Sequence, residues 1–463
     1  MKYERDGLLL PERTEPQIDE ELFGSLEAVL GSGKEVYQRL TVSGDRKTEV
    51  LDAWHNGEDA SLVAEPVEEE DFTLKQAALR QWKQELIARE DLDPEIKQLY
   101  RWKVNEHIAN VNILIASSKG DMNNFRRWNE FIYGKPDEDI YRGALDWIAH
   151  DAETLIAEEG QNPATAEAAQ NVLNMLADKR GYRELLAPEE KTFGEVREDH
   201  MRETGYYGLL LAGVEMPTGK VNREIGDPIL QQVLKNIGSS KPIVDAGGAT
   251  WGMTSAGASR PKEYNMILER FIGLGLGHEI GSHEIERING HRGPLAIAGE
   301  GLDRYEAGNE GRAVVREEVQ YETFDEFGKL LRWRDIMRRH IAISFASGTG
   351  ADRPATSSET YDFVNTIDLM YQTKLKPDQP EAAFAAAQKK TDDLLARVLK
   401  GTDGTGGAYL KDKVYLEGHV AVFLEAATRG ASAISEGDVA KYDISNPRHL
   451  SALQKYGLLP VAE

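Results

Sequence analysis

The sequence predicts an α+β protein that is mainly helical and contains a small mixed sheet. Apolar residues recur every three or four positions through most of residues 72–205 and again after Pro261, which indicates amphipathic helices. Between these regions lie two short stretches, "YYGLLLAGV" (206–214) and "KPIVDAGGATWGMTSA" (241–256), that are rich in strand-forming residues and bounded by glycine. We therefore expect two helical regions on either side of a small sheet.

The helices can be placed from their periodicity and from their start signals. One of the clearest follows Asp93, an N-cap residue that precedes Pro94 at the first helical position. The expected helices span residues 74–90, 93–116, 121–132, 137–158, 164–178, 188–203, 227–237, 261–289, 308–346, 358–374, 379–400, 409–427 and 446–456.

The composition excludes several classes of function. The chain has 463 residues and no cysteine, so disulfides, iron–sulfur clusters and thiol catalysis are ruled out, and any transition metal must be held by histidines and carboxylates. The net charge of −24 argues against a nucleic-acid partner. Neither a signal-peptide pattern nor an apolar run of about 18 residues is seen, so we expect a cytoplasmic protein without a membrane partner.

The stretch "GHEIGSHEIERINGH" (277–291) carries the strongest chemical signal. His278, Glu279 and His283 form an H-E-x-x-x-H pattern, one residue longer than the H-E-x-x-H of zinc hydrolases. In zinc hydrolases the glutamate that follows the first histidine is the general base that activates a water molecule. An apolar helical stretch leads into the motif, so we expect the motif to be buried.

The extra residue requires an unusual helix. On a regular α-helix, residues four apart differ by about 40° around the axis and residues five apart by about 140°, so His278 and His283 would diverge. A π-bulge would bring both onto one face, and Gly281 between them tolerates the wider turn. The alternative is that the two histidines are unrelated residues of an ordinary helix.

A catalytic zinc site takes three protein ligands, so a third one is needed. Glu310 lies in the first turn of an expected helix, and Gly311 beside it would allow a close approach between helices. The alternative for Glu310 is a carboxylate that stabilises the helix N-terminus. Three further glutamates compete for the same role: Glu306, Glu317 and Glu318.

These motifs resemble those of the microtubule-associated tyrosine carboxypeptidase family, whose bacterial members carry a QEGLA motif. "HEIGSH" (278–283) and "NEGRA" (309–313) resemble the family's "HEIGTH" and "QEGLA". "FRRWNEFIYGKPDE" (125–138) and "GGAYLKDKVYLEGHV" (406–420) resemble two further segments of the family, in the same order. The resemblance spans roughly residues 75–430.

The resemblance implies a zincin-like metallopeptidase that binds one Zn²⁺ per chain. His278, His283 and Glu310 would be the zinc ligands, and Glu279 the general base. The animal members of the family remove the C-terminal tyrosine of α-tubulin. For this chain we expect the C-terminus of a peptide or protein as the substrate, and the sequence names neither the substrate nor the oligomeric state.

The chain departs from the family pattern at four positions. Ser282 replaces a threonine, and Glu286 stands where the family has an arginine three residues after the second histidine. Asn309 and Arg312 replace the glutamine and the leucine of QEGLA. None of these is a proposed ligand, but Glu286 and Arg312 are expected to alter the pocket and with it the substrate.

A carboxypeptidase also needs a cation for the terminal carboxylate and a donor for the oxyanion. Lys411, Arg312 and Arg292 are the candidates for the cation, and Tyr409 and Tyr415 for the donor, each with a purely structural role as the alternative. The stretch "GATWGMTSA" could form an edge strand that pairs with an extended peptide beside the metal helix, or an ordinary core strand.

Together, the residues and the resemblance predict a zinc-dependent carboxypeptidase. Three alternatives stay open: a dipeptidyl-peptidase-like activity, an endopeptidase and a non-catalytic zinc-binding scaffold. We expect residues 1–70 to form an N-terminal extension or a small subdomain and residues 71–463 to form the zincin-like catalytic domain. Within this domain the expected parts are a helical part (71–205), a strand-containing part (206–260), the metal-site helices (261–346) and the C-terminal helices (347–463).

Overall fold

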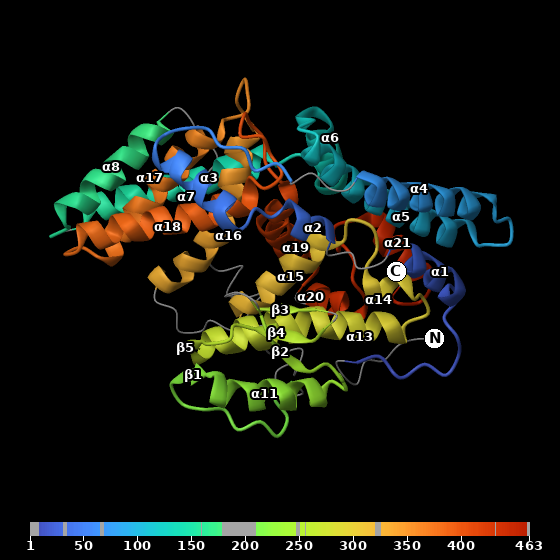
Figure 1. The fold of residues 1–463 in the computed structure, drawn as a ribbon. Helices are drawn as coiled ribbons and strands as arrows, with labels where there is room; N and C mark the ends of the chain where they lie inside the picture. Colours follow the sequence, from blue (N-terminus) through green and yellow to red (C-terminus); the bar gives the residue numbers. More distant parts are fainter. Residues whose placement is uncertain are drawn as a thin grey trace.

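The computed structural model confirms a mainly helical fold with small sheets (Figure 1). None of the helices in the described part of the chain combines the length and the hydropathy that a membrane span requires. The structure describes residues 9–30, 35–64, 69–158, 160–177, 210–246, 251–254, 256–319, 326–430 and 432–460.

The first three helices pack into the body of the protein. They are α1 (Glu20–Leu30), α2 (Glu35–Leu40) and α3 (Gly44–His55). Leu26, Leu40 and Trp54 on these helices are buried among residues from later parts of the chain. The division at residue 70 stays a prediction, but the segment before it shares apolar cores with helices from the rest of the chain.

The helices of the next region begin and end close to the predicted positions. They are α4 (Glu69–Ala88), α5 (Pro94–Ser118), α6 (Met122–Tyr133), α7 (Glu138–Ala157) and α8 (Pro163–Leu176). The predicted cap is confirmed, because the Asp93 side chain accepts a hydrogen bond from the backbone N–H of Glu95. The expected helix 188–203 lies outside the described residues.

Within the described residues, five short strands form two sheets next to the helix α11 (Arg223–Asn236). β1 (Lys220–Asn222) pairs antiparallel with β5 (Asn265–Ile267). The second sheet has the order β2–β4–β3 and is mixed, as predicted: β2 (Ile243–Asp245) runs parallel to β4 (Ala258–Arg260), and β3 (Gly252–Met253) runs antiparallel to it.

Two predictions about this region are wrong. Within the expected strand 206–214 the described residues 210–213 form the end of a helix and a turn. Part of the expected helix 261–289 is strand β5, and the helical backbone begins at Leu268. The short apolar runs carried no signal strong enough to separate strand from turn.

A long continuous helical segment follows β5 and contains the histidine motif. It consists of α12 (Leu268–Arg270), the π-helix η1 (Phe271–Glu284) and α13 (Ile285–Arg292). α14 (Ile297–Glu300) and α15 (Glu306–Val319) come next.

The C-terminal region is again helical. It contains α16 (Glu326–Ala346), α17 (Ser357–Leu375), α18 (Pro380–Val398), η2 (Leu410–Lys413), α19 (Val414–Arg429), α20 (Ser432–Glu436), η3 (Gly437–Val439) and α21 (Pro447–Lys455). The predicted helix 308–346 corresponds to α15 and α16, with residues 320–325 outside the described part.

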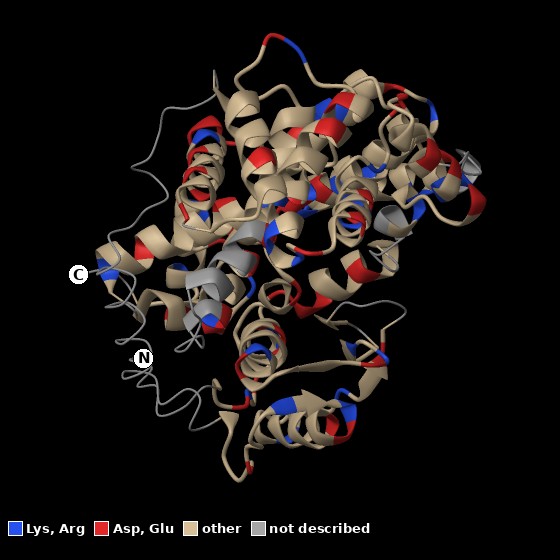
Figure 2. Cartoon of the chain, turned by 90° about the vertical axis from the view of Figure 1, so that its left-hand side faces the viewer, with Lys and Arg blue, Asp and Glu red and all other residues tan. Residues whose placement is uncertain are grey.

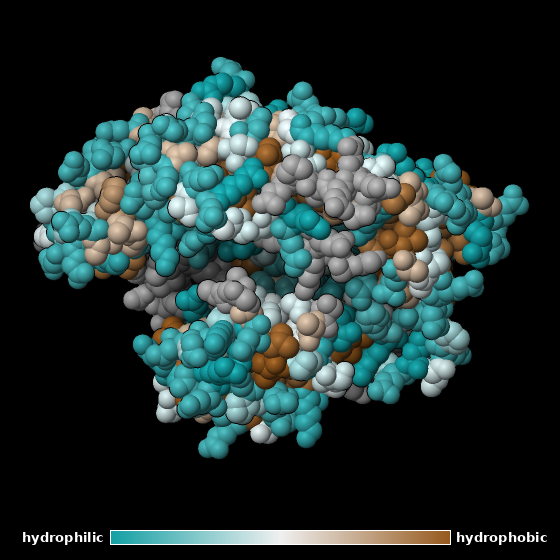
Figure 3. Space-filling view, viewed as in Figure 1, coloured by the Kyte–Doolittle hydropathy of each residue, from teal (hydrophilic) through white to brown (hydrophobic). Residues whose placement is uncertain are grey.

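The described residues form three apolar cores, and the first two of them meet at α15 and α19. One core lies around α4, α5 and α21, the second around α7, α8 and α16–α18, and the third around α11 and η1 (Figure 1). α15 places Val314 in the second core and Val315 in the first, and α19 likewise contributes to both. On the face shown in Figure 3 the surface is hollowed between the helical part and the part that holds the sheets.

Acidic and basic residues are interspersed along the described helices, as the colours of Figure 2 show. The net negative charge is therefore not confined to one element.

Candidate metal centre

Three side chains from two helices converge on one point. Nε2 of His278 lies 3.5 Å and Nε2 of His283 lies 3.7 Å from Oε2 of Glu310. One donor atom from each residue lies within 4.8 Å of the other two. Two imidazoles and one carboxylate are a donor set that zinc takes in catalytic sites. This group can hold a metal ion.

The histidines share a face because the helix is wide. Residues 271–284 form a π-helix, in which hydrogen bonds join residues five apart, so that His278 and His283 lie above one another. The two rings are 5.0 Å apart at an angle of 82°. The side chain of Ser282 also donates to the carbonyl of Gly277, five residues back, over 3.0 Å. The predicted widening is confirmed, but it extends over 14 residues rather than a single bulge.

The wide helix is supported from two sides. A Cβ atom at Gly275 would lie 3.1 Å from the ring of Trp251, so glycine lets the strand region pack closely on the helix. On the other side, the buried guanidinium of Arg316 donates to the carbonyl of Gly281 over 2.9 Å and pairs with Asp438 at 2.6 Å. Arg316 thus holds the turn between the two histidines.

Glu310 lies close to the histidines because α15 packs between η1 and α19. A Cβ atom at Gly311 would overlap the backbone of Gly418 on α19, and a Cβ atom at Gly418 would overlap the carbonyl of Ala307. The close approach predicted for Gly311 is therefore made with α19, on the side of α15 away from the histidine helix. This contact fixes the distance between α15 and α19.

The electrostatics of the three side chains suit a metal ion. Oε2 of Glu310 is buried without a hydrogen-bond partner among the described residues, as expected of an oxygen that serves as a ligand. Burial alone would raise the pKa of Glu310, but His283, His278 and Lys411 outweigh it and lower the pKa to about 2. Burial lowers the pKa of His283, which favours the neutral imidazole that binds metals.

Two further glutamates flank His278. Oε1 of Glu279 lies 3.9 Å from its Nε2, on the side of the three donors. Oε2 of Glu317 lies 3.4 Å from its Nδ1, on the far side, and the side chain of Glu317 is fully buried. A carboxylate behind a ligating histidine fixes the orientation of the ring.

The spacing of the glutamates in the sequence could have indicated that Glu317 lies near His278. Glu317 stands seven residues after Glu310, and seven residues bring a helical side chain back to nearly the same face. Among the other competitors for the third ligand, Glu306 bonds to Lys411 instead. The side chain of Glu318 lies outside what the structure describes.

Three departures from the family pattern meet in one contact. The carboxylate of Glu286 pairs with the guanidinium of Arg312 and accepts a hydrogen bond from the side-chain amide of Asn309. All three side chains are buried. Because Asn309 and Arg312 flank Glu310, and Glu286 lies one turn after His283, this contact ties together the two helices that carry the candidate ligands. We refer to Glu286, Asn309 and Arg312 as the strut.

The three proposed cations lie in different places. Arg312 belongs to the strut. Arg292 donates to the carbonyl of Leu10 over 2.8 Å and lies 3.6 Å from Glu12, on the N-terminal segment. Lys411 bonds to Glu306 at 2.6 Å and is close enough to Glu310 to lower its pKa.

The two tyrosines also differ in their surroundings. The hydroxyl of Tyr409 lies 3.3 Å from that of Tyr133. Burial, followed by the charge of Glu310, raises the pKa of Tyr415, so its hydroxyl keeps its proton and can donate. The guanidinium of Arg339 stacks on the Tyr415 ring at 5.1 Å. The oxyanion role of either residue stays a prediction.

Residues 266–459 match the profile of the family described as "Microtubule-associated tyrosine carboxypeptidase". The chain carries a domain of this family. The matched domain begins in β5, ends after α21 and contains His278, His283 and Glu310. Its family implies a metallopeptidase of the carboxypeptidase type. A search of curated proteins and a search of solved structures found no match.

Proposed function

We propose that the protein is a zinc-dependent carboxypeptidase that hydrolyses the last peptide bond of a peptide or protein. One observation carries the proposal. His278, His283 and Glu310 come within 4.8 Å of one another, and Glu279 lies next to them with its carboxylate 3.9 Å from His278. The family match supports the same reaction.

The roles of the residues follow from their positions. A zinc ion held by His278, His283 and Glu310 would supply Lewis acidity to water and to the scissile carbonyl. Glu279 takes a proton from the attacking water as the new C–O bond forms. It then gives this proton to the amine nitrogen as the C–N bond breaks, so one carboxylate serves both steps.

Lys411 is our candidate for the cation that binds the C-terminal carboxylate of the substrate. It is the one proposed cation whose charge acts on Glu310, and about 31% of its side chain is exposed, so a substrate can reach it. Its ammonium is bonded to Glu306, which fixes its position. A carboxylate on an ammonium group forms a charge-assisted hydrogen bond, stronger than a neutral one.

The backbone of the substrate has a partner next to the metal centre. β3 is at the edge of its sheet and packs against η1. We propose that an extended peptide adds to this edge strand, so that main-chain hydrogen bonds bring the scissile bond to the three donors. The outer position of β3 favours the edge strand over the core strand, the two alternatives that the sequence left open.

Digestion of a peptide library, followed by mass spectrometry, tests the proposal. We expect loss of one C-terminal residue from free peptides, little loss from amidated ones, and no product after zinc removal by a chelator. The name of the matched family makes C-terminal tyrosine the first residue to examine. Equal cleavage of free and amidated peptides would mean an endopeptidase or an aminopeptidase, and zinc binding without any cleavage would mean a scaffold.

Glu279→Gln separates binding from chemistry. The variant keeps the size of the side chain and removes the base, so zinc should stay bound while kcat falls by about 10²-fold or more. An unchanged kcat would assign the base to another residue.

A further inference from the structure

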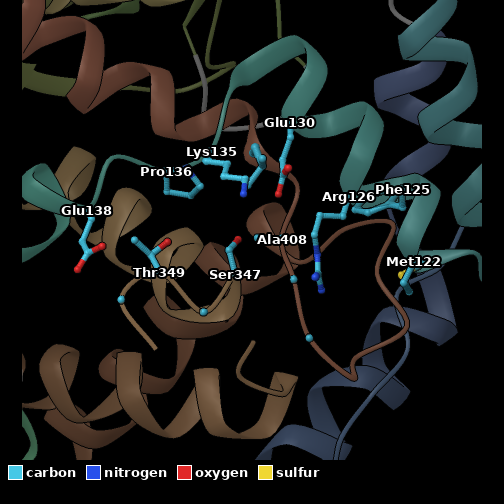
Figure 4. A pocket seen from close by; sticks show the side chains of 15 residues that line it. Met122, Phe125, Arg126, Glu130, Lys135, Pro136, Glu138, Ser347, Thr349 and Ala408 are labelled. Atoms are coloured by element: carbon cyan, nitrogen blue, oxygen red, sulfur yellow. The ribbon is translucent and has the colours of Figure 1, made fainter. Parts of the chain in front are cut away.

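A cavity of about 320 Å³ lies outside the metal-binding group. It is partly open to solvent and is lined by α6, the turn between α6 and α7, the turn after α16 and the glycine-rich segment before η2 (Figure 4). None of the residues of the metal-binding group lines it. The volume is at the lower end of the range for small-molecule sites.

Five polar side chains point into this cavity. Figure 4 shows Glu130 and Lys135 reaching in from one side, Ser347 and Thr349 from the opposite side, and Arg126 along the edge. Within the described part of the chain, none of these five side chains has a hydrogen-bond or ion-pair partner. The hydroxyl oxygen of Ser347 is buried and has no hydrogen-bond partner among the described residues.

The charges in the cavity have both signs. Glu138 also lines it, but its carboxylate is bonded to Arg142, at 2.6 Å from one guanidinium nitrogen and 2.9 Å from another. Of the charged residues that line the cavity, two cations, Arg126 and Lys135, and one carboxylate, Glu130, have no ion-pair partner within the described part of the chain; both cations are exposed and Glu130 is half-buried. A simple anion would satisfy the cations but would face the charge of Glu130. A ligand that carries both a carboxylate and an ammonium group would satisfy all three.

We propose that this cavity binds a free α-amino acid. Its carboxylate would lie between Arg126 and Lys135, its ammonium group on Glu130, and its remaining polar atoms near the hydroxyl of Thr349. The cavity has room for such a molecule.

Binding of amino acids to the full-length protein tests the proposal. Alanine, glutamate and tyrosine, each with its N-acetyl derivative and its decarboxylated amine, would be titrated by calorimetry and by ligand-observed NMR. We expect at least one amino acid to bind, and both of its derivatives to bind at least about tenfold more weakly, because each has lost one charged group.

Variants locate the site. Arg126→Met and Lys135→Met should each weaken binding about tenfold or more, and Glu130→Gln should remove the discrimination against the N-acetyl derivative. Arg127→Met is the matched control, since Arg127 lies on the same helix but stacks on Trp128 at 5.1 Å. It should leave binding unchanged.

The metal centre must be excluded as the place of binding. The same titrations with His283→Ala, which disrupts the metal-binding group and not the cavity, should give the same affinity. Binding that disappears in His283→Ala but survives in Lys135→Met would overturn the proposal. So would phosphate that binds as tightly as the amino acids, or the lack of any saturable binding up to about 10 mM.

Discussion

The metal-binding group and the three proposed substrate-binding cations of this protein are organised in opposite ways. His278, His283 and Glu310 converge on one point from two buried helices. Of the cations, Lys411 lies near that point, Arg312 is buried in the strut, and Arg292 contacts the N-terminal segment.

The difference teaches which kinds of residue can be placed from sequence. The histidines lie on one continuous helix, so their spacing fixes their relation once the type of helix is known. A single arginine can be satisfied by any carboxylate that the fold brings near it, and spacing gives no information about that partner. Four predictions test this comparison, from the largest expected effect to the smallest.

The largest effect is expected when a ligand is removed. His283→Ala should reduce the zinc content from about one per chain to nearly none, a greater loss than the roughly 10–100-fold contributed by partners behind a ligand. His291→Ala is the control, because His291 belongs to the same sequence motif but lies 3.2 Å from Glu300. Elemental analysis of untagged protein measures both. Equal zinc in the two variants would refute the assignment of His283.

Removal of Arg312 should affect stability before it affects substrate binding. Arg312→Met leaves Glu286 buried without its counter-charge, which typically costs on the order of 3–5 kcal/mol. Denaturant unfolding measures this loss. The double variant Glu286→Gln, Arg312→Met should regain part of it. Normal stability together with a raised KM would instead make Arg312 a substrate-binding residue.

Lys411 and Arg292 should differ in their effect on substrate binding. Lys411→Ala should raise KM for peptides with a free C-terminus by about 10- to 100-fold, as expected when a charge-assisted hydrogen bond is lost. Arg292→Ala should leave KM unchanged, since this arginine bonds to the N-terminal segment. The reverse result would exchange their roles.

The smallest effect concerns the contact between His291 and Glu300. A hydrogen bond from His291 lowers the pKa of Glu300 from its ordinary 4.5 to about 2, against the opposing effect of burial. Because the pKa of Glu300 is lowered in the folded state, the ionised carboxylate stabilises the folded protein above pH 4.5. This contribution to the free energy of unfolding is lost as the pH falls towards 2. Because 47% of the Glu300 side chain is exposed, solvent screening limits the effect to about 1 kcal/mol or less.

Unfolding measured at pH 7 and pH 3 checks this pH dependence. Glu300→Gln should be less stable than the parent protein at pH 7, and the difference should be smaller at pH 3. A difference that stays the same at pH 3 would have another cause.

Most helices and the metal-binding group could be predicted from the sequence. Helix periodicity extends over many residues, and caps such as Asp93 mark where helices begin. The stretch 241–256 contains β2 and β3, as its strand-forming residues predicted, whereas β1, β4 and β5 could not be placed, because a run of three residues has no period. The length of the π-helix was also hidden, since it depends on contacts from distant residues: Trp251 against Gly275, and Arg316 at the Gly281 carbonyl.

The strut could not be predicted from the sequence, for a different reason. The sequence shows that Glu286, Asn309 and Arg312 depart from the family pattern, and it suggests that two of them alter the pocket. In the folded chain the departures satisfy one another, so the guanidinium of Arg312 is held within the protein. Only the packing of η1 and α13 against α15 reveals that Glu286 and Arg312 compensate each other.

The glycine crossing of α15 and α19 has a consequence for the variation of this protein. Gly311 and Gly418 are far apart in the sequence, yet a side chain at Gly311 would overlap the backbone of Gly418, and a side chain at Gly418 would overlap the backbone of Ala307, one turn before Gly311. A methyl group at either position would push α15 away from α19 and move Glu310, one residue from the crossing. Each position therefore requires glycine for its own reason. A sequence that has lost either glycine has also lost the contact that fixes the position of Glu310.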